Sequence, residues 1–200
     1  MAEALLHFWF GTFTDGFSDS AHRKRWFSGG ADFDEECRLR FGPLSAAIIA
    51  GEHEDWLDTP RGRLACILAC DQLPRNIHRG TAAAFSGDAR ALQIAKLGVE
   101  LSLDRDLEFD ERAFFYMPFE HSERLIDQHT SVGLFTRLRD ATPSGRRHLS
   151  GSYLQFAQQH RDLIERFGRF PHRNGVLGRI STPEELEYLR GGNDFGQTSH

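Results

Sequence analysis

The chain has few cysteines and no long apolar run. Its three cysteines, Cys37, Cys66 and Cys70, are an odd number without the paired spacing of a disulfide framework, so we expect reduced thiols. The first apolar stretch, residues 5–10, is too short for a signal sequence or a membrane span. These absences predict a soluble, cytoplasmic protein with no membrane partner.

Lysine is almost absent. Lys24 and Lys96 are the only lysines among 24 basic residues, and 29 acidic residues leave a net charge of −5. Nucleic-acid binding without sequence preference needs a broad basic surface that neutralises phosphates, so this balance argues against it. The cations are almost all arginines, and a local cluster of arginines could still hold one or two anionic groups.

Several motifs of known chemistry are also missing. The chain has no glycine-rich phosphate loop, dinucleotide-binding fingerprint, nucleophile elbow or metal-ligand spacing of histidines and cysteines. Strand-like alternation of useful length is absent, whereas apolar residues recur at helical spacing throughout. With 40% hydrophobic residues and 17 phenylalanines, the 200 residues can bury one aromatic-rich core.

Helical spacing predicts an all-α fold. We expect a single domain, residues 1–192, of about seven or eight helices in antiparallel pairs, followed by a flexible tail, residues 193–200. The expected helices run over about residues 2–10, 33–50, from 60 into the low 70s, from 82 to 99, 121–138, from 146 to 167 and from 183 to 190, with a short aromatic turn from 110.

Local signals mark some helix ends. Thr59 with Pro60 predicts a helix start, as does the capping-box pattern of residues 182–185. Gly168 is well placed as a left-handed helix end. Pro74 is expected to disturb one helix, and a proline at residue 118 to break the aromatic turn.

Three short polar segments interrupt the helical pattern, each beside a strongly apolar helix. They are residues 71–76 (Asp-Gln-Leu-Pro-Arg-Asn), residues 118–128 (Pro-Phe-Glu-His-Ser-Glu leading to Asp-Gln) and residues 166–174 (Arg-Phe-Gly-Arg-Phe-Pro-His-Arg-Asn). An ionisable side chain that turns inward is costly unless it is paired or used. The candidate site is therefore expected in these three polar segments.

Four polar residues fall on inward faces of the predicted helices: Asp71, His121, Gln128 and His160. Violations of hydrophobic patterning concentrate at functional sites. A structural interpretation stays open, because His160 can be a core histidine with both nitrogens satisfied. Asp71 can also form an ion pair with Arg75, one helical turn further on.

Glu120, Glu123 and Asp127 share one helical face. Carboxylates at this spacing can bind a divalent cation when a second helix supplies more ligands. The sequence offers no such ligand motif. We therefore predict no metal site and interpret these three residues as a solvated acidic face.

The third polar segment is the most suggestive of an anionic ligand. Arg166, Arg169 and Arg173 lie at and just beyond a helix end, together with His172 and Asn174. Guanidinium groups bind carboxylates and phosphates through two parallel hydrogen bonds. The alternative is that these arginines neutralise helix-terminal carbonyls and nearby acidic residues.

The combination of motifs resembles the bacterial DUF924 family of uncharacterised proteins. The matching stretches are Phe-Trp-Phe-Gly at residues 8–11, residues 71–81, residues 115–128 and residues 166–179. The resemblance covers nearly the whole chain. The sequence departs from the family pattern at Leu73, His78 and Met117, and these departures leave the polar positions of the motifs unchanged. It implies an all-helical, tetratricopeptide-like fold and no established activity.

Our leading hypothesis is a small anionic molecule bound by all three polar segments. The arginines would hold its anionic group, and a histidine would act as general acid or base, because imidazole titrates near neutral pH. An aspartate would orient its histidine or arginine partner. The predicted catalytic residues are His121, His172 and Asp71, and the predicted ligand-binding residues are Arg75, Asn76, Tyr116, Gln128, His160, Arg169, Arg173 and Asn174.

A second hypothesis belongs to a different class of protein. A helical-repeat adaptor would bind a protein segment in a long groove, with the polar segments acting as internal struts. The sequence leaves open which hypothesis holds, whether the protein is an enzyme, and which cofactor, if any, it uses.

Overall fold

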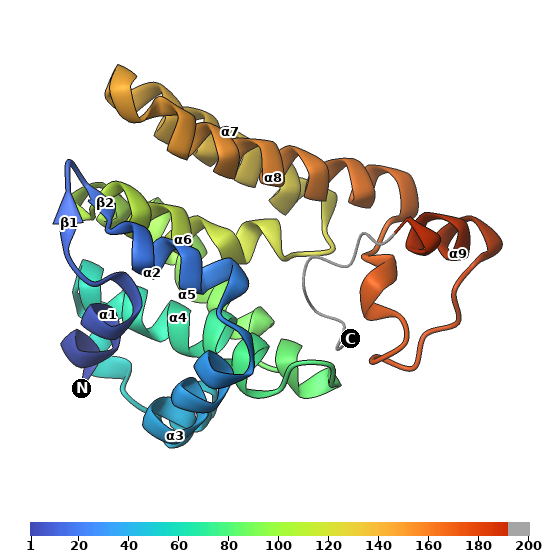
Figure 1. The fold of residues 1–200 in the computed structure, drawn as a ribbon, viewed down its shortest axis with the longest axis horizontal. Coiled ribbons are helices and arrows are strands. Elements are labelled where there is room, and N and C mark those ends of the chain that lie inside the picture. The colour runs from blue at the N-terminus through green and yellow to red at the C-terminus, as the bar shows by residue number, and fades with distance from the viewer. Residues whose placement is uncertain (192–200) are drawn as a thin grey trace.

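A single central helix organises the fold. The computed structural model describes residues 1–191, apart from the side chains of Phe27 and Ser28. Helix α4 lies in the middle and packs on α1, α3, α5 and α6 (Figure 1). The α-helices are α1 (Ala2–Phe10), α2 (Ser20–Ser28), α3 (Gly30–Ile49), α4 (Pro60–Ile77), α5 (Asp88–Glu100), α6 (Phe109–Glu120), α7 (Leu125–Ala141), α8 (Arg147–Phe167) and α9 (Pro183–Arg190).

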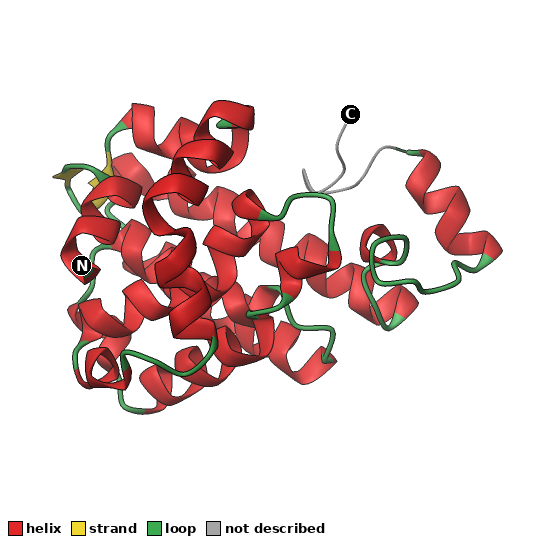
Figure 2. Ribbon diagram, turned by 90° about the horizontal axis from the view of Figure 1, so that it is seen from below, coloured by secondary structure: helices red, strands yellow, loops and turns green. Residues whose placement is uncertain are grey.

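Short elements connect these helices. Strands β1 (Phe13–Thr14) and β2 (Phe17–Ser18) pair antiparallel in a two-stranded hairpin between α1 and α2. Five 3₁₀ turns complete the described elements: η1 (Glu54–Asp58), η2 (Ala82–Phe85), η3 (Leu103–Asp106), η4 (Ser144–Arg146) and η5 (Pro171–Arg173). The described chain is therefore an all-α single domain, as predicted (Figure 2).

Helix α4 is buried on all sides. Every residue from Gly62 to Asn76 is buried, because small and aliphatic side chains surround the helix and four other helices cover it. A helix that is enclosed all round needs no polar face. The polar residues in its second half, including Asp71 and Arg75, must therefore find partners inside the protein.

The core between α1, α2, α3 and α6 is aromatic. Phe114 packs edge-on against Trp9, Phe10 and Trp26, with ring centroids 5.7, 5.4 and 4.7 Å away. The indole N–H of Trp26 donates to the carbonyl oxygen of Trp9 at 2.7 Å, which satisfies the one polar atom that this ring buries. Many of the phenylalanines in the described chain therefore pack into this main core.

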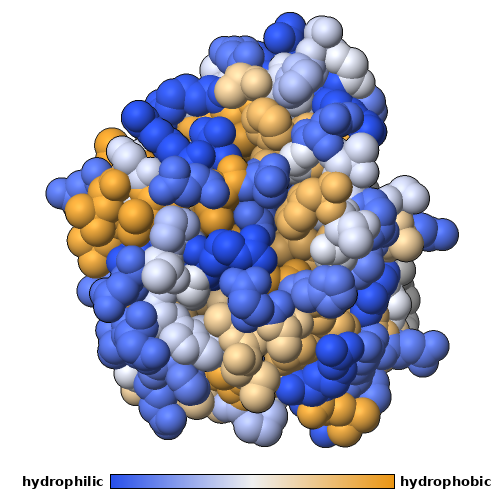
Figure 3. Space-filling model, turned by 90° about the vertical axis from the view of Figure 1, so that its left-hand side faces the viewer, coloured by the Kyte–Doolittle hydropathy of each residue, from blue (hydrophilic) through white to orange (hydrophobic). Residues whose placement is uncertain are grey.

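Helices α6, α7 and α8 form a second layer above α4, with α7 and α8 side by side along the molecule (Figure 1). The chain then leaves α8 and builds η5 and α9, which lie at the far end from the N-terminus in both ribbon views. This end has its own small apolar cluster of Leu163, Ile164 and Phe170, with Tyr188 packed against it. The surface at the N-terminal end of the molecule shows hydrophobic residues interspersed with hydrophilic ones (Figure 3).

The predicted caps are confirmed. The Thr59 hydroxyl accepts the N–H of Gly62 at 3.1 Å, and Gly168 ends α8 with a left-handed φ of 69°. Thr182 and Glu185 form the reciprocal capping box that opens α9. The tail predicted for residues 193–200 lies outside the described residues.

Other local predictions are wrong. Helices α4 and α6 continue through Pro74 and Pro118 instead of breaking, and α2 was not predicted at all. The helix expected from residue 121 begins at Leu125.

Candidate functional site

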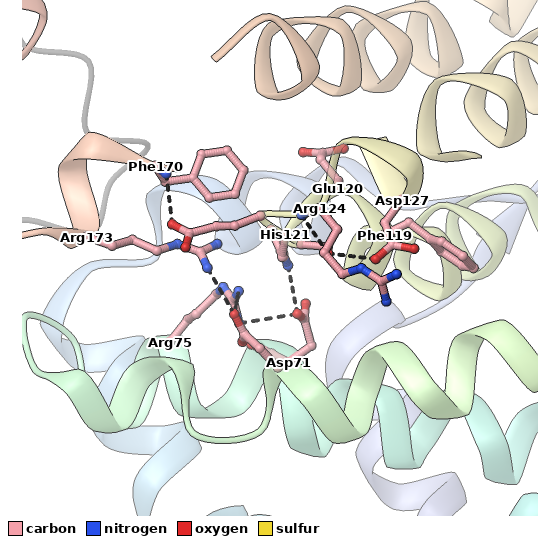
Figure 4. A network of polar contacts seen from close by, with 12 residues as sticks. Asp71, Arg75, Phe119, Glu120, His121, Arg124, Asp127, Phe170 and Arg173 are labelled. Carbon is pink, nitrogen blue, oxygen red and sulfur yellow. Dashed lines mark hydrogen bonds and ion pairs between the residues drawn. The ribbon is translucent and has the colours of Figure 1, made fainter. Parts of the chain in front are cut away.

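The three polar segments meet around the second half of α4. Asp71 and Arg75 lie on this helix, Glu120 and His121 lie at the end of α6, His160 comes from α8, and Arg173 from η5. In Figure 4, His121 points towards Asp71 from above, and Arg173 approaches Arg75 from the side. Contacts between distant parts of the chain therefore build one polar cluster.

A proline and a glycine shape the local backbone. Pro74 has no N–H, so the carbonyl of Cys70, one turn earlier, has no helical donor. A Cβ atom on Gly87 would lie only 2.1 Å from that carbonyl oxygen, so only glycine allows this approach. The contact sets the start of α5 against α4 and brings Asp88, its first residue, beside Arg75.

Asp71 and His121 form a buried pair. Nδ1 of His121 lies 2.7 Å from Oδ1 of Asp71, whose side chain is fully buried. Arg75 holds the same carboxylate oxygen at 3.2 Å, and the amide of Gln72 donates to the other oxygen. Burial alone would raise the pKa of Asp71, but Arg75 and His121 outweigh it and lower the pKa below its usual value.

His121 is accordingly set up as a neutral acceptor. Burial and the nearby Arg75 charge lower the pKa of His121 below its usual value, against the opposing effect of Asp71. A neutral ring that donates through Nδ1 to Asp71 carries its lone pair on Nε2. Within residues 1–191, Nε2 has no hydrogen-bond partner, and 14% of the side chain is exposed.

Two arginines share one carboxylate. Arg75 donates to both oxygens of Asp88, at 2.8 and 3.1 Å, and Arg173 donates to Oδ2 of Asp88 at 3.2 Å. The Arg173 guanidinium lies over the rings of Phe85 and Phe170, 4.6 and 4.5 Å from their centroids. Burial and the Arg75 charge lower the pKa of Arg173 to about 10.

Arg173 is poorly satisfied for a buried cation. The residue is only 6% exposed, yet the contact with Asp88 is the one hydrogen bond of its side chain in the described chain, and its Nε has no partner there. A guanidinium offers five N–H donors, and buried donors without partners are costly. This guanidinium therefore carries donors that no group in the described chain accepts.

The solvated acidic face predicted for Glu120, Glu123 and Asp127 is wrong. Glu123 forms two hydrogen bonds with Arg179 and accepts the backbone N–H of Phe170, so it ties the third polar segment to the second. Asp127 is buried and pairs with Lys96. Glu120 is buried as well, and its only ion-pair partner in the described chain is a histidine.

Glu120 and His160 form a second buried acid–histidine pair. Oε1 of Glu120 lies 3.2 Å from Nδ1 of His160, and each side chain is 8% exposed. Burial and the Asp71 charge raise the pKa of Glu120 to about 8. Burial and the nearby His121 lower the pKa of His160 to about 3, so both groups are neutral at pH 7.

Some predicted site residues lie in the cluster or at its edge. Asp71, Arg75, His121, His160 and Arg173 meet there, as described above. His172 packs beside Phe170, with 5.5 Å between ring centroids, and Asn76 donates back to the carbonyl of Gln72 on α4.

The other predicted residues have structural partners elsewhere. Tyr116 donates to Asp104 inside the core. The Gln128 amide donates to the carbonyls of Glu120 and Ser122, both at 2.6 Å, and so fixes the turn that carries His121. Arg169 and Asn174 both bond to Glu185 at the start of α9. The structure does not bring these four functional groups into the cluster.

Sequence reasoning missed Glu120 and Asp88 as members of the cluster. Glu120 was visible in the second polar segment, but its lack of a cation is decided by tertiary contacts. Asp88 follows a glycine at a helix start, a local signal of capping that says nothing about Arg75 and Arg173.

Among residues 1–191, no three His, Cys, Asp or Glu side chains are arranged to hold a metal ion. No described helix is both long and apolar enough to cross a membrane.

The fold and the cluster define a class: an all-helical protein with a buried carboxylate–histidine–arginine cluster. The chain belongs to the DUF924 family, whose model, described as a bacterial protein of unknown function, matches residues 5–193. It is also similar to a solved structure of a protein of unknown function from Agrobacterium tumefaciens. The identity is 37%, the TM-score is 0.80, and the match covers 96% of this chain and 97% of the other. A search of curated proteins finds no match.

Proposed function

We propose that the protein binds a small anionic molecule at this cluster, with Arg173 and Arg75 holding the anionic group and His121 accepting a proton. The observation that carries the proposal is the state of Arg173, a buried guanidinium with a single hydrogen bond in the described chain. A carboxylate or phosphate supplies two acceptor oxygens in the geometry that a guanidinium fits.

The Asp71–His121 pair supports the chemical part of the proposal. A buried carboxylate that accepts the Nδ1 hydrogen fixes the imidazole tautomer and leaves Nε2 as the base. Arg75 contacts both Asp71 and Asp88, so it links the proton acceptor to the anion-binding arginine. We also propose a cytoplasmic location, supported by Cys37, Cys66 and Cys70, which are all buried free thiols.

Thermal shift of the purified protein tests this proposal. The probes are inorganic phosphate, citrate and adenosine monophosphate, and the variants are Arg173→Gln and a matched control, Arg166→Gln, whose side chain is 53% exposed. A bound probe raises the melting temperature by mass action. We expect at least one probe to stabilise the wild type and Arg166→Gln but not Arg173→Gln. An equal response in all three proteins, or no response in any, contradicts the proposal.

A second candidate is the tetratricopeptide-like adaptor. It is supported by the structural use of Gln128, Arg169 and Asn174, which act as internal struts. The C-terminal end also exposes Ile180 (90%) and Leu186 (48%) as apolar contacts for a protein segment. No probe response, together with strong destabilisation of Arg173→Gln, favours this candidate.

A further inference from the structure

The second polar segment contains three acidic residues, of which two pair with a cation and one does not. Glu123 is paired with Arg179 and Asp127 with Lys96, so each has a cation. Glu120 has neither, although it is 6% exposed and more deeply enclosed than Glu123. An isolated carboxylate is too costly to bury, so a buried carboxyl without a cation keeps its proton.

The surroundings of Glu120 reinforce this conclusion. The charges of Asp71 and Arg75 on α4 act on the pKa of Glu120, His160 lies within ion-pair distance of it on α8, and His121 follows it directly in the chain. Asp71 is ionised and repels a second negative charge, while Arg75 is engaged by Asp71 and Asp88. His160 is the only group within ion-pair distance, and burial opposes its protonation. A carboxylic acid and a neutral imidazole leave this site without a net charge, and Nδ1 of His160 also lies 2.9 Å from the carbonyl oxygen of Phe156.

His160 contacts both the protonated acid and the base. The rings of His121 and His160 are 6.2 Å apart, and His160 contacts Glu120 at 3.2 Å. In Figure 4, His121 points down to Asp71, whereas Glu120 points the other way, towards the helices above. Two carboxyl groups in one cluster thus differ in protonation: Asp71 is ionised beside its cation, and Glu120 is neutral. Such separation marks the acid and the base of many active sites.

We propose that Glu120, held by His160, is the proton donor of this site and His121 its proton acceptor. This inference rests on the proposed function, because both groups would act on the anionic ligand held by Arg75 and Arg173. In the proposed step, a proton bound to one ligand atom moves to Nε2 of His121, and the carboxyl proton of Glu120 moves to a second ligand atom. Proton number and charge balance, since one proton leaves the ligand and one arrives. The ligand class is a small anion that carries one acidic and one basic atom.

The step requires Glu120 to be protonated and Nε2 of His121 to be unprotonated at the same pH. Both protonation states can be measured without any ligand. Infrared difference spectroscopy detects the carbonyl stretch of a protonated carboxyl group, and ¹⁵N NMR reports the tautomer of each histidine. We expect wild-type protein at pH 7 to show a carboxylic-acid band that Glu120→Gln removes and that fades as the pH rises past about 8. Glu123→Gln, the matched control with an Arg-paired carboxylate, leaves this band unchanged.

The NMR spectrum must show His121 neutral at pH 7, with hydrogen on Nδ1 and none on Nε2. Absence of a band that Glu120→Gln removes excludes Glu120 as the donor, and a charged or Nε2-protonated His121 excludes the acceptor. Either result overturns this inference without touching anion binding, which the thermal-shift comparison of Arg173→Gln tests separately. Because glutamine resembles the protonated acid in shape and charge, Glu120→Gln is expected to fold.

Discussion

The burial of Glu120 predicts an unusual dependence of stability on pH. In the folded protein its pKa is about 8, against an ordinary value of 4.5 that applies to the unfolded chain. Because the folded value is raised, the unfolded state loses this proton first as the pH increases. The protonated carboxyl therefore contributes its full stability below about pH 4.5, and this contribution is lost as the pH rises through about 8.

The magnitude follows from the size of the shift. Between these two pKa values the free energy of unfolding falls by about 1.4 kcal/mol per pH unit, so the whole interval corresponds to a loss of about 5 kcal/mol. Glutamine cannot ionise, so Glu120→Gln lacks this dependence. Relative to that variant, the wild type is expected to become steadily less stable from pH 5.5 to 8 and then to level off.

Urea denaturation at pH 5.5, 7.0, 8.0 and 9.0 measures the difference, with Glu123→Gln as the control of opposite sign. Burial raises the pKa of Glu123, but Arg179 outweighs it and lowers the pKa overall. Its stabilising effect is therefore present above the unfolded pKa and is lost as the pH falls through the folded one. A wild-type stability that tracks Glu120→Gln in parallel across this pH range refutes the neutral-acid assignment.

Two further predictions concern α4 and its neighbours. Asp71→Asn is expected to destabilise the fold by about 3 kcal/mol in urea denaturation, the low end for breaking a buried ion pair, because Asp88 still neutralises Arg75; no loss of stability would mean that Asp71 is not ionised. Gly87→Ala is expected to lose about 1–3 kcal/mol through its clash with the α4 backbone. Gly151→Ala in α8, where a Cβ atom meets nothing within 4 Å, is expected to gain about 1 kcal/mol, and equal effects of both alanines would contradict the close contact.

The fold class could be predicted because its signals are local. Helical periodicity, the Thr59 cap, the left-handed Gly168 and the capping box at Thr182 each depend on a few neighbouring residues. The predicted breaks at Pro74 and Pro118 were wrong because a helix can continue through a proline when the structure around it tolerates the carbonyl that loses its helical donor. At Pro74 the freed carbonyl, that of Cys70, lies against Gly87, which is thirteen residues further along the chain than Pro74 and cannot be foreseen from neighbouring residues.

The sequence predicted where the candidate site lies but not which residues of the three polar segments belong to it. Asp71 and His121 stood out as polar residues on apolar helical faces, and the structure joins them. In the third segment, Arg169 and Arg173 look equivalent in sequence, yet Arg169 bonds to Glu185 and Arg173 turns into the cluster. The sequence places Glu120 on one face with Glu123 and Asp127. In the structure Glu123 pairs with Arg179 and Asp127 with Lys96, whereas Glu120 is buried without a cation. These assignments depend on which helix ends meet in space.

The most direct test of the central claim is NMR of the His121 imidazole during titration with whichever probe stabilises the protein. If Arg173 and His121 serve one site, the His121 signals move in the wild type and in Arg166→Gln as the probe binds. The same signals stay in place in Arg173→Gln at equal probe concentration. Probe binding that leaves His121 unmoved in the wild type would contradict a shared site.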